Sequence, residues 1–197
     1  MANGKVRLTD TGTVAATVLS GIGAITEGTV TVNGAMTITG STEEIKNALV
    51  TETSKVIATT SANVTFVGDN PTGAELADIN DAAGGTITLA NNAQTFTGTA
   101  AVMKSAFAGG LANTQTGAVK ISDTNGTIAA TVLTDITAQT SGTVTAAAAG
   151  ITITGTTTEV KAAIVTEATK AVMANGKVRL TDTGTVAATV LSGIGAI

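Results

Sequence analysis

Residues Met1–Ile25, MANGKVRLTDTGTVAATVLSGIGAI, decide how this sequence is organised, because the same letters return at Met173–Ile197. The offset between the two copies is 173 − 1 = 172, and self-similarity at a fixed period is the signature of repeat proteins. The second copy stops at Ile197, in the middle of a unit, so we expect this sequence to be a window from a longer periodic chain. In the alternative, the chain is complete or engineered and its segment 173–197 acts as a cap or a swapped segment.

A finer period lies inside the long one. Gly28, Gly85 and Gly142 are each followed by Thr, and their offsets are 85 − 28 = 57 and 142 − 85 = 57. The first and third units are closely alike, whereas the middle unit has diverged around Pro71. We therefore divide the chain into repeat unit 1 (residues 1–56), a diverged repeat unit 2 (57–116), repeat unit 3 (117–172) and the start of the next period (173–197).

Strand patterns and helix patterns alternate along each unit. Lys5–Thr9 and Ala118–Ser122 place their apolar residues on one face, which is the period-2 signal of a β-strand. Thr13–Ile22 repeats its apolar residues at helical spacing. Ser41 with Glu44, and Thr156 with Glu159, have the spacing of a helix capping box, which predicts a helix start at each.

The spacing of these signals predicts the fold class. Successive apolar residues that end the strand patterns are offset by between 121 − 96 = 25 and 153 − 121 = 32. We expect an α/β repeat, a solenoid-like array of strand-turn-helix units of about 28 residues, paired into units of about 57. The alternative is a β-solenoid, or bead-like β-rich domains with short helices. The strand-ending residues are Leu8, Ile38, Phe66, Phe96, Ile121, Ile153 and Leu180.

Composition excludes several function classes. The chain has no Cys and no His, which removes Ser-His-Asp and Cys-His triads, zinc fingers and CxxC redox pairs. Its net charge of −4 argues against a nucleic-acid partner. A hydrophobic content of 43% is unlike that of a disordered chain. Because no run of about 18 apolar residues occurs, we expect no membrane span.

Four aspartates are the candidate metal ligands. Asp10, Asp69, Asp123 and Asp182 recur at the predicted strand-to-helix turns. Calcium binds six to eight oxygen atoms, and these carboxylates are weak candidates for it. An aspartate at a helix N-terminus or in an Asx-turn needs no metal, and we favour this interpretation because neither an EF-hand loop nor a GGxGxDxUx nonapeptide is present. No catalytic or cofactor-binding residue is predicted.

Threonine pairs suggest a binding face. Alternate threonines in a strand share one face of the sheet, and a flat outward array of them would resemble the face of ice-binding β-solenoids. Such a face needs even spacing, whereas these units vary in length and helices interrupt them. Threonine is also simply a good exposed strand residue. The pairs are Thr29/Thr31, Thr37/Thr39, Thr86/Thr88, Thr95/Thr97, Thr143/Thr145 and Thr152/Thr154.

The third unit resembles a known repeat type. The segments VKISDT (119–124), GTIAATVL (126–133), TSGTV (140–144) and ITGT (153–156) are similar to SDTGTAAxVL, TTGTV and LTGTAADV repeats. These repeats occur in very large bacterial, notably cyanobacterial, surface and adhesin-like proteins. Where that pattern has Ala-Asp-Val, this chain has Thr-Glu-Val or Glu-Glu-Ile.

The resemblance implies an extracellular or cell-surface location and a structural role without enzyme activity. We expect a self-assembling module of a filament, surface layer or long adhesin, which joins copies of itself or adjacent repeats head-to-tail through continuing strands and apolar stripes. The alternative is a binding module, such as an adhesin tip or a threonine face that binds glycans or ice. Surface glycans are the candidate partner in that case.

Overall fold

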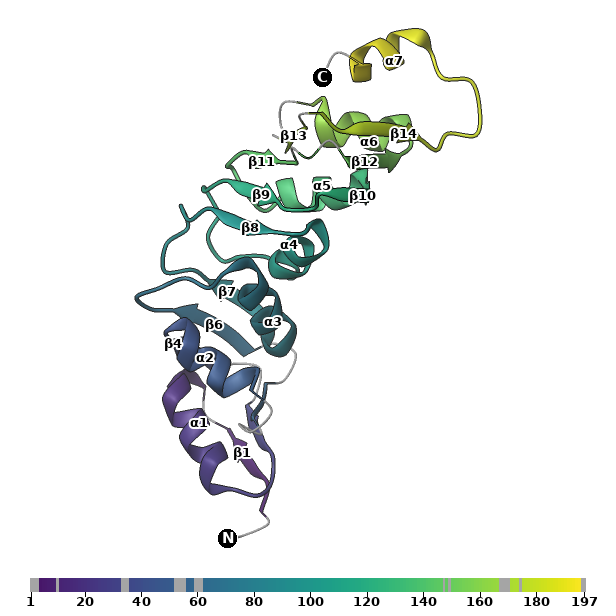
Figure 1. Cartoon of the computed structure of the whole chain (residues 1–197). Coiled ribbons are helices and arrows are strands. Elements are labelled where there is room, and N and C mark those ends of the chain that lie inside the picture. The colour runs from purple at the N-terminus through teal and green to yellow at the C-terminus, as the bar shows by residue number, and fades with distance from the viewer. Residues whose placement is uncertain are drawn as a thin grey trace. The chain divides into compact units, whose positions relative to one another are not determined.

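The computed structural model describes residues 4–9, 11–32, 36–51, 56–58, 62–146, 148, 150–166, 171–173 and 175–195. Within these ranges the protein is a mixed α/β structure in which short strands alternate with seven helices (Figure 1). The chain forms two compact units, residues 1–92 with 105–113, and residues 93–104 with 114–197. These units are defined by spatial contacts, so the four segments drawn from the sequence repeats stay a prediction.

Unit 1 contains two parallel sheets, ordered β1-β3-β5 and β2-β4-β6-β7, and three helices. The strands are β1 (Val6–Leu8), β2 (Gly12–Ala15), β3 (Val30–Val32), β4 (Met36–Gly40), β5 (Val56–Ala58), β6 (Ala62–Phe66) and β7 (Gly84–Thr88). The helices are α1 (Ala16–Ile25), α2 (Thr42–Leu49) and α3 (Gly73–Ala83).

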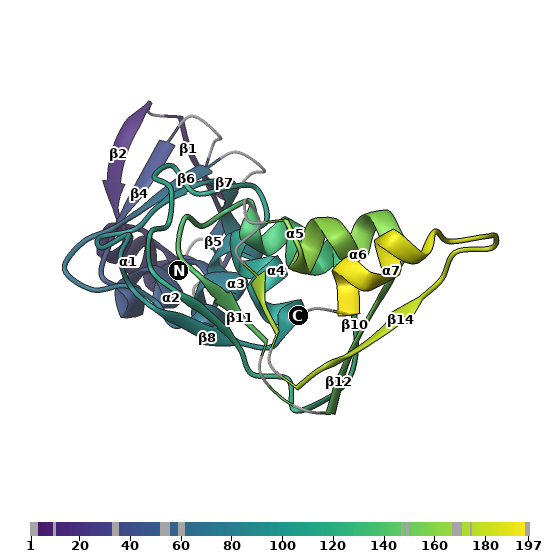
Figure 2. The ribbon, with the colours of Figure 1, turned by 90° about the horizontal axis from the view of Figure 1, so that it is seen from above.

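Unit 2 also contains two parallel sheets, ordered β13-β11-β9-β8 and β10-β12-β14. Helices α5, α6 and α7 run next to one another (Figure 2). The strands are β8 (Phe96–Gly98), β9 (Val119–Ile121), β10 (Asn125–Ala129), β11 (Val144–Thr145), β12 (Gly150–Gly155), β13 (Ala171–Val172) and β14 (Lys177–Leu180). The helices are α4 (Ala100–Phe107), which crosses the unit boundary, α5 (Ala130–Thr137), α6 (Thr157–Ile164) and α7 (Ala188–Gly195).

Every strand pair in the described ranges is parallel. The sequence offset between paired residues ranges from 84 − 62 = 22 to 171 − 144 = 27. A parallel pair needs a crossover connection, and a helix is the usual one. Each crossover here contains one helix, and most of them also contain a second short strand before or after that helix, as β4 precedes α2 between β3 and β5.

The core consists mostly of aliphatic side chains, with the three phenylalanines also buried. In unit 1, Leu19, Val30, Ile38 and Ile45 are fully buried, from one helix, two strands and a second helix. In unit 2, Val119, Ile136, Ile151 and Ile153 are fully buried in the same way. Because strand side chains alternate between the two faces, the threonines between these residues lie on the opposite face.

The predicted strands are present, but one predicted helix is shorter at its start. Helical spacing predicts a helix from Thr13, whereas α1 begins at Ala16. Residues 12–15 form β2 instead, because Thr13 and Val14 pair with Thr37 and Ile38 of β4. β-branched residues at this point favour a strand that has a partner to pair with.

The predicted capping boxes are confirmed. At both Ser41 and Thr156 the hydroxyl accepts the N–H of the residue three positions on, and that residue's carboxylate accepts the cap's own N–H. A third box, Thr72 with Glu75, begins α3. This third box was not among the predicted ones, although Thr-x-x-Glu directly after Pro71 is the same signal.

The structure explains the glycines that mark the finer sequence period. A β-carbon on Gly28 would lie 2.6 Å from the carbonyl oxygen of Gly4. On Gly85 it would lie 2.3 Å from that of Ala62, and on Gly142 it would lie 2.1 Å from that of Gly117. At each position, therefore, the backbone of a neighbouring segment fills the space that a side chain needs.

Candidate functional site

Three of the four predicted aspartates cap a helix that precedes them in the chain. Asp69 Oδ1 accepts the N–H of Thr42 at 3.0 Å, and Asp123 Oδ2 accepts that of Ala100 at 2.7 Å. Asp182 accepts both the N–H of Thr157 at 2.8 Å and its hydroxyl at 3.0 Å. Thr42, Ala100 and Thr157 are the first residues of α2, α4 and α6. Asp10 lies outside the described residues.

This geometry gives the aspartates a structural role. A helix N-terminus has unpaired N–H groups and a partial positive charge, so a carboxylate there is stabilising. The expected role was that of a helix N-terminal or Asx-turn aspartate. Each of these three aspartates ties its own turn to the first residue of a helix that begins 23 to 27 residues earlier. Calcium binding stays a prediction, and within the described ranges no three acidic side chains gather as a metal site would require.

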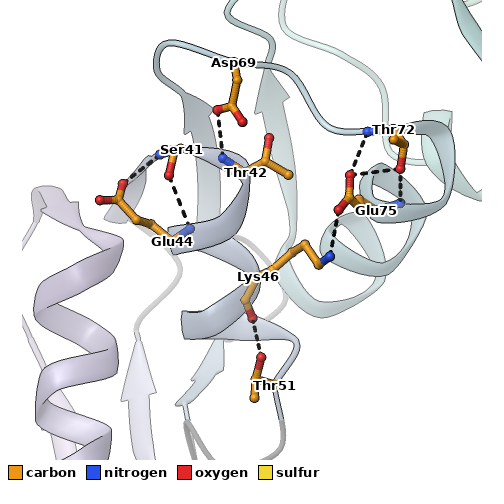
Figure 3. A network of polar contacts seen from close by, with 8 residues as sticks. All are labelled: Ser41, Thr42, Glu44, Lys46, Thr51, Asp69, Thr72 and Glu75. Atoms are coloured by element: carbon orange, nitrogen blue, oxygen red, sulfur yellow. Dashed lines mark hydrogen bonds and ion pairs between the residues drawn. The ribbon is translucent and has the colours of Figure 1, made fainter.

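A polar cluster joins α2 to the start of α3 (Figure 3). Lys46 Nζ donates to Glu75 Oε1 at 2.7 Å, and Glu75 Oε2 accepts the N–H of Thr72 at 2.9 Å. The cluster borders an open depression of about 510 Å³ that is lined by polar residues, among them Asn47, Asp69 and Asn70. The Glu75 carboxylate is thus bound both to the Lys46 ammonium and to the start of α3, which is an arrangement that fixes a turn.

The ion pair changes the ionisation of both partners. The hydrogen bond from Lys46, followed by that from the Thr72 backbone, lowers the pKa of Glu75 from 4.5 to about 2. The hydrogen bond to Glu75 raises the pKa of Lys46. A second lysine, Lys104, also forms an ion pair, since its Nζ lies 2.9 Å from Asp135 Oδ2. The Lys46–Glu75 pair is partly exposed and the Lys104–Asp135 pair is well exposed, so each contributes little to stability.

We expect Glu75→Gln to lower the free energy of unfolding by about 1 kcal/mol near pH 7, through loss of the ion pair and of the negative charge at the start of α3, while the amide oxygen can still accept the Thr72 N–H. Because the pKa of Glu75 is lowered in the folded chain, its contribution is complete above about pH 4.5 and disappears as the pH falls to about 2. Urea titrations at several pH values measure the difference between the two proteins. Glu43→Gln removes the same charge outside the capping boxes and serves as the control. A Glu75→Gln deficit that is equally large near pH 2 would contradict this account.

The threonine pairs form only short rows. Thr39, Thr65 and Thr88 are neighbours in register across β4, β6 and β7. In unit 2, however, Lys177 and Arg179 of β14 lie beside Thr152 and Thr154 of β12. Charged side chains thus interrupt the face on which an even threonine array was considered. Binding of ice or glycans stays a prediction.

The chain matches no known protein family, no curated protein and no solved structure. Among the described residues, no helix has both the length and the apolar character that crossing a bilayer requires. The features that bear on function are parallel strand ladders, aspartates that connect a turn to an earlier helix, and an identical segment at two positions.

Proposed function

We propose that this protein is a non-enzymatic structural repeat module of an extracellular filament, surface layer or long adhesin. It assembles head-to-tail as its strands and apolar stripes continue from one copy to the next. Its strand-turn-helix repeats of about 28 residues stack as a solenoid-like α/β array. Each repeat supplies strands to two parallel ladders and a helix to the outer layer. The extracellular placement rests on the resemblance of residues 119–156 to bacterial surface repeats.

The observation that carries the proposal is the nearly constant step of the ladders. The sequence numbers of partners differ by 24 at Val6 and Val30, by 26 at Val30 and Val56, and by 25 at Val119 and Val144. A regular step in parallel register adds each new strand at the same edge, so the pairing has no built-in end. Strands β1 and β14 each lie at the end of a described sheet, and the outer edge of an end strand is a template for another strand.

The aspartate caps support the same proposal. Each one connects a turn to the helix of the preceding step, at sequence separations of 27, 23 and 25 residues. In the proposed array such a contact joins neighbouring steps, and one of the three lies in unit 1 and two lie in unit 2. The stability of an array of this kind is a sum of nearest-neighbour interfaces.

Sedimentation velocity over a wide concentration range tests this function. We expect the sedimentation coefficient to rise with concentration without reaching a plateau, because heterologous contacts that do not close produce open-ended assemblies. A single compact, monodisperse species at every concentration would contradict the proposal.

A further inference from the structure

The repeated segment is present twice, and in the described sheets each copy has a partner strand on one side. In the first copy, β1 pairs with β3, in the register Val6 with Val30. In the second copy, β14 pairs with β12, in the register Val178 with Ile153. Both strands are the end strands of their described sheets. One sequence therefore pairs with a following strand in one place and with a preceding strand in the other.

Strand β9 has both neighbours at once. It is similar in sequence to the repeated segment, with Val-Lys-Ile-Ser-Asp at 119–123 where the copies have Val-Arg-Leu-Thr-Asp. On one side Val119 pairs with Phe96 of β8, and on the other side it pairs with Val144 of β11. The order β8-β9-β11 thus joins, in one ladder, the two kinds of pairing that the repeated segment makes separately.

The hydrogen bonds agree on both sides. Toward the preceding strand, Ser122 N–H donates to Gly98 O at 2.8 Å, and Thr181 N–H donates to Gly155 O at 2.9 Å. Toward the following strand, the N–H of Val119 donates to the carbonyl of Thr143, and the N–H of Val6 donates to that of Thr29, both at 2.9 Å.

The aspartate caps match between β9 and β14 as well. Asp123, which follows β9, binds the first residue of α4, and Asp182, which follows β14, binds the first residue of α6.

Burial shows what each copy lacks. Val119 of the doubly paired strand is fully buried, whereas Val6 and Val178 are only half-buried. The helices differ more. Leu19 of α1, which packs against α2, is 0% exposed, but the identical Leu191 of α7 is 44% exposed. The second copy therefore has an exposed leucine at a position that is buried in the first copy, where α1 contacts α2 and the strands β2 to β5.

We propose that residues 177–195 of one chain take the place of residues 5–23 in a second copy of this chain. Lys177–Leu180 then lies between β12 of its own chain and β3 of the second copy, as β9 lies between β8 and β11. Helix α7 packs on α2 of the second copy and buries Leu191 as Leu19 is buried. This junction rests on the proposed function, and it names the segment through which the copies join.

This replacement is favoured because one segment then makes the contacts that two segments made before. Within the described ranges of separate chains, residues 177–195 contact only the preceding strand and helix, and residues 5–23 contact only the following ones. In the junction, residues 177–195 contact both. The displaced residues 5–23 of the second copy regain the conformational freedom that folding had removed. The segment that replaces them is identical in sequence, so the second copy loses no side-chain complementarity at β3, β4 and α2.

Mixed disulfide cross-linking tests the junction, because the chain has no native cysteine. One batch carries Arg179→Cys and the other Thr31→Cys, since Arg7, the equivalent of Arg179, pairs with Thr31. In the control mixture, a chain with Lys120→Cys takes the place of the chain with Arg179→Cys. Lys120 is an exposed residue of β9, a strand that already has a partner on each side. Oxidation of the mixture should yield about ten-fold more mixed dimer with Arg179→Cys, because a disulfide needs Cα atoms within about 7 Å. All three substitutions lie on partly or fully exposed strand positions, which preserves the fold.

The outcomes separate the junction from the function. A mixed dimer that is enriched over the control supports the junction. Large assemblies without that enrichment overturn the junction and leave the structural module in place. If the mixture contains only single chains, both proposals fail. As a second measurement, Leu191→Asp should abolish the enrichment while the far-UV circular dichroism spectrum stays that of the parent chain. Persistence of the cross-link in that variant would also overturn the junction.

Discussion

Leu19→Ala is expected to lower the free energy of unfolding by about 3 kcal/mol, and Leu191→Ala by about 1 kcal/mol or less. The two leucines occupy the same place in the two identical segments. Leu19 is fully buried, so its truncation leaves a cavity, whereas Leu191 is 44% exposed and loses little contact. The chain has no Trp or Tyr, so far-UV circular dichroism during urea titration is the suitable signal.

This comparison controls for local sequence, because helix propensity and flanking residues are the same at both sites. The titration belongs at low protein concentration, where the chains are separate. Under assembly conditions the cost of Leu191→Ala should rise toward that of Leu19→Ala, since the junction buries Leu191. Equal costs for the two variants in separate chains would contradict the packing described for α1 and α7.

Gly142→Ala is expected to destabilise the protein by about 3 kcal/mol, although it adds a single methyl group. The new β-carbon would lie 2.1 Å from the carbonyl oxygen of Gly117 and 2.5 Å from its carbonyl carbon. Both are backbone atoms of a neighbouring segment, so relief requires the two segments to separate and weakens the pairing of β9 with β11. Thermal unfolding followed by circular dichroism measures the loss.

Gly21→Ala is the matched control. Gly21 lies inside α1, and no heavy atom stands within 4 Å of its added β-carbon. Alanine is the better helix former, so this variant should gain about 0.5–1 kcal/mol. The two substitutions are chemically identical and are expected to have opposite signs. A Gly142→Ala protein as stable as the parent would show that the backbones at Gly117 and Gly142 are not in such close contact.

The sequence predicts the elements whose signals are local. Alternation at Lys5–Thr9 and the boxes at Ser41 and Thr156 need only a few neighbouring residues, and the corresponding strand and helices are present. The spacing of Thr13–Ile22 favours a helix throughout, because the strand character of its first residues depends on pairing with β4, a strand that lies one crossover later in the chain. Periodicity in one segment does not contain that partner.

In the candidate site, too, some features have local sequence signals and others depend on a partner that is distant in the sequence. The recurrence of Asp69, Asp123 and Asp182 is visible in the sequence, and a helix-terminal role is the favoured interpretation of it. The helix that each aspartate caps is not predictable, because the choice between the following and the preceding helix depends on how successive turns stack. The two different positions of the identical segment, as β1 and as β14, are invisible for the same reason.

Negative-stain electron microscopy of the purified chain, beside its Leu191→Asp variant, shows whether copies assemble head-to-tail. We expect elongated particles with a regular axial repeat of a few nanometres for the parent chain, and single short particles for the variant. Compact, monodisperse particles of the parent chain at every concentration would contradict head-to-tail assembly.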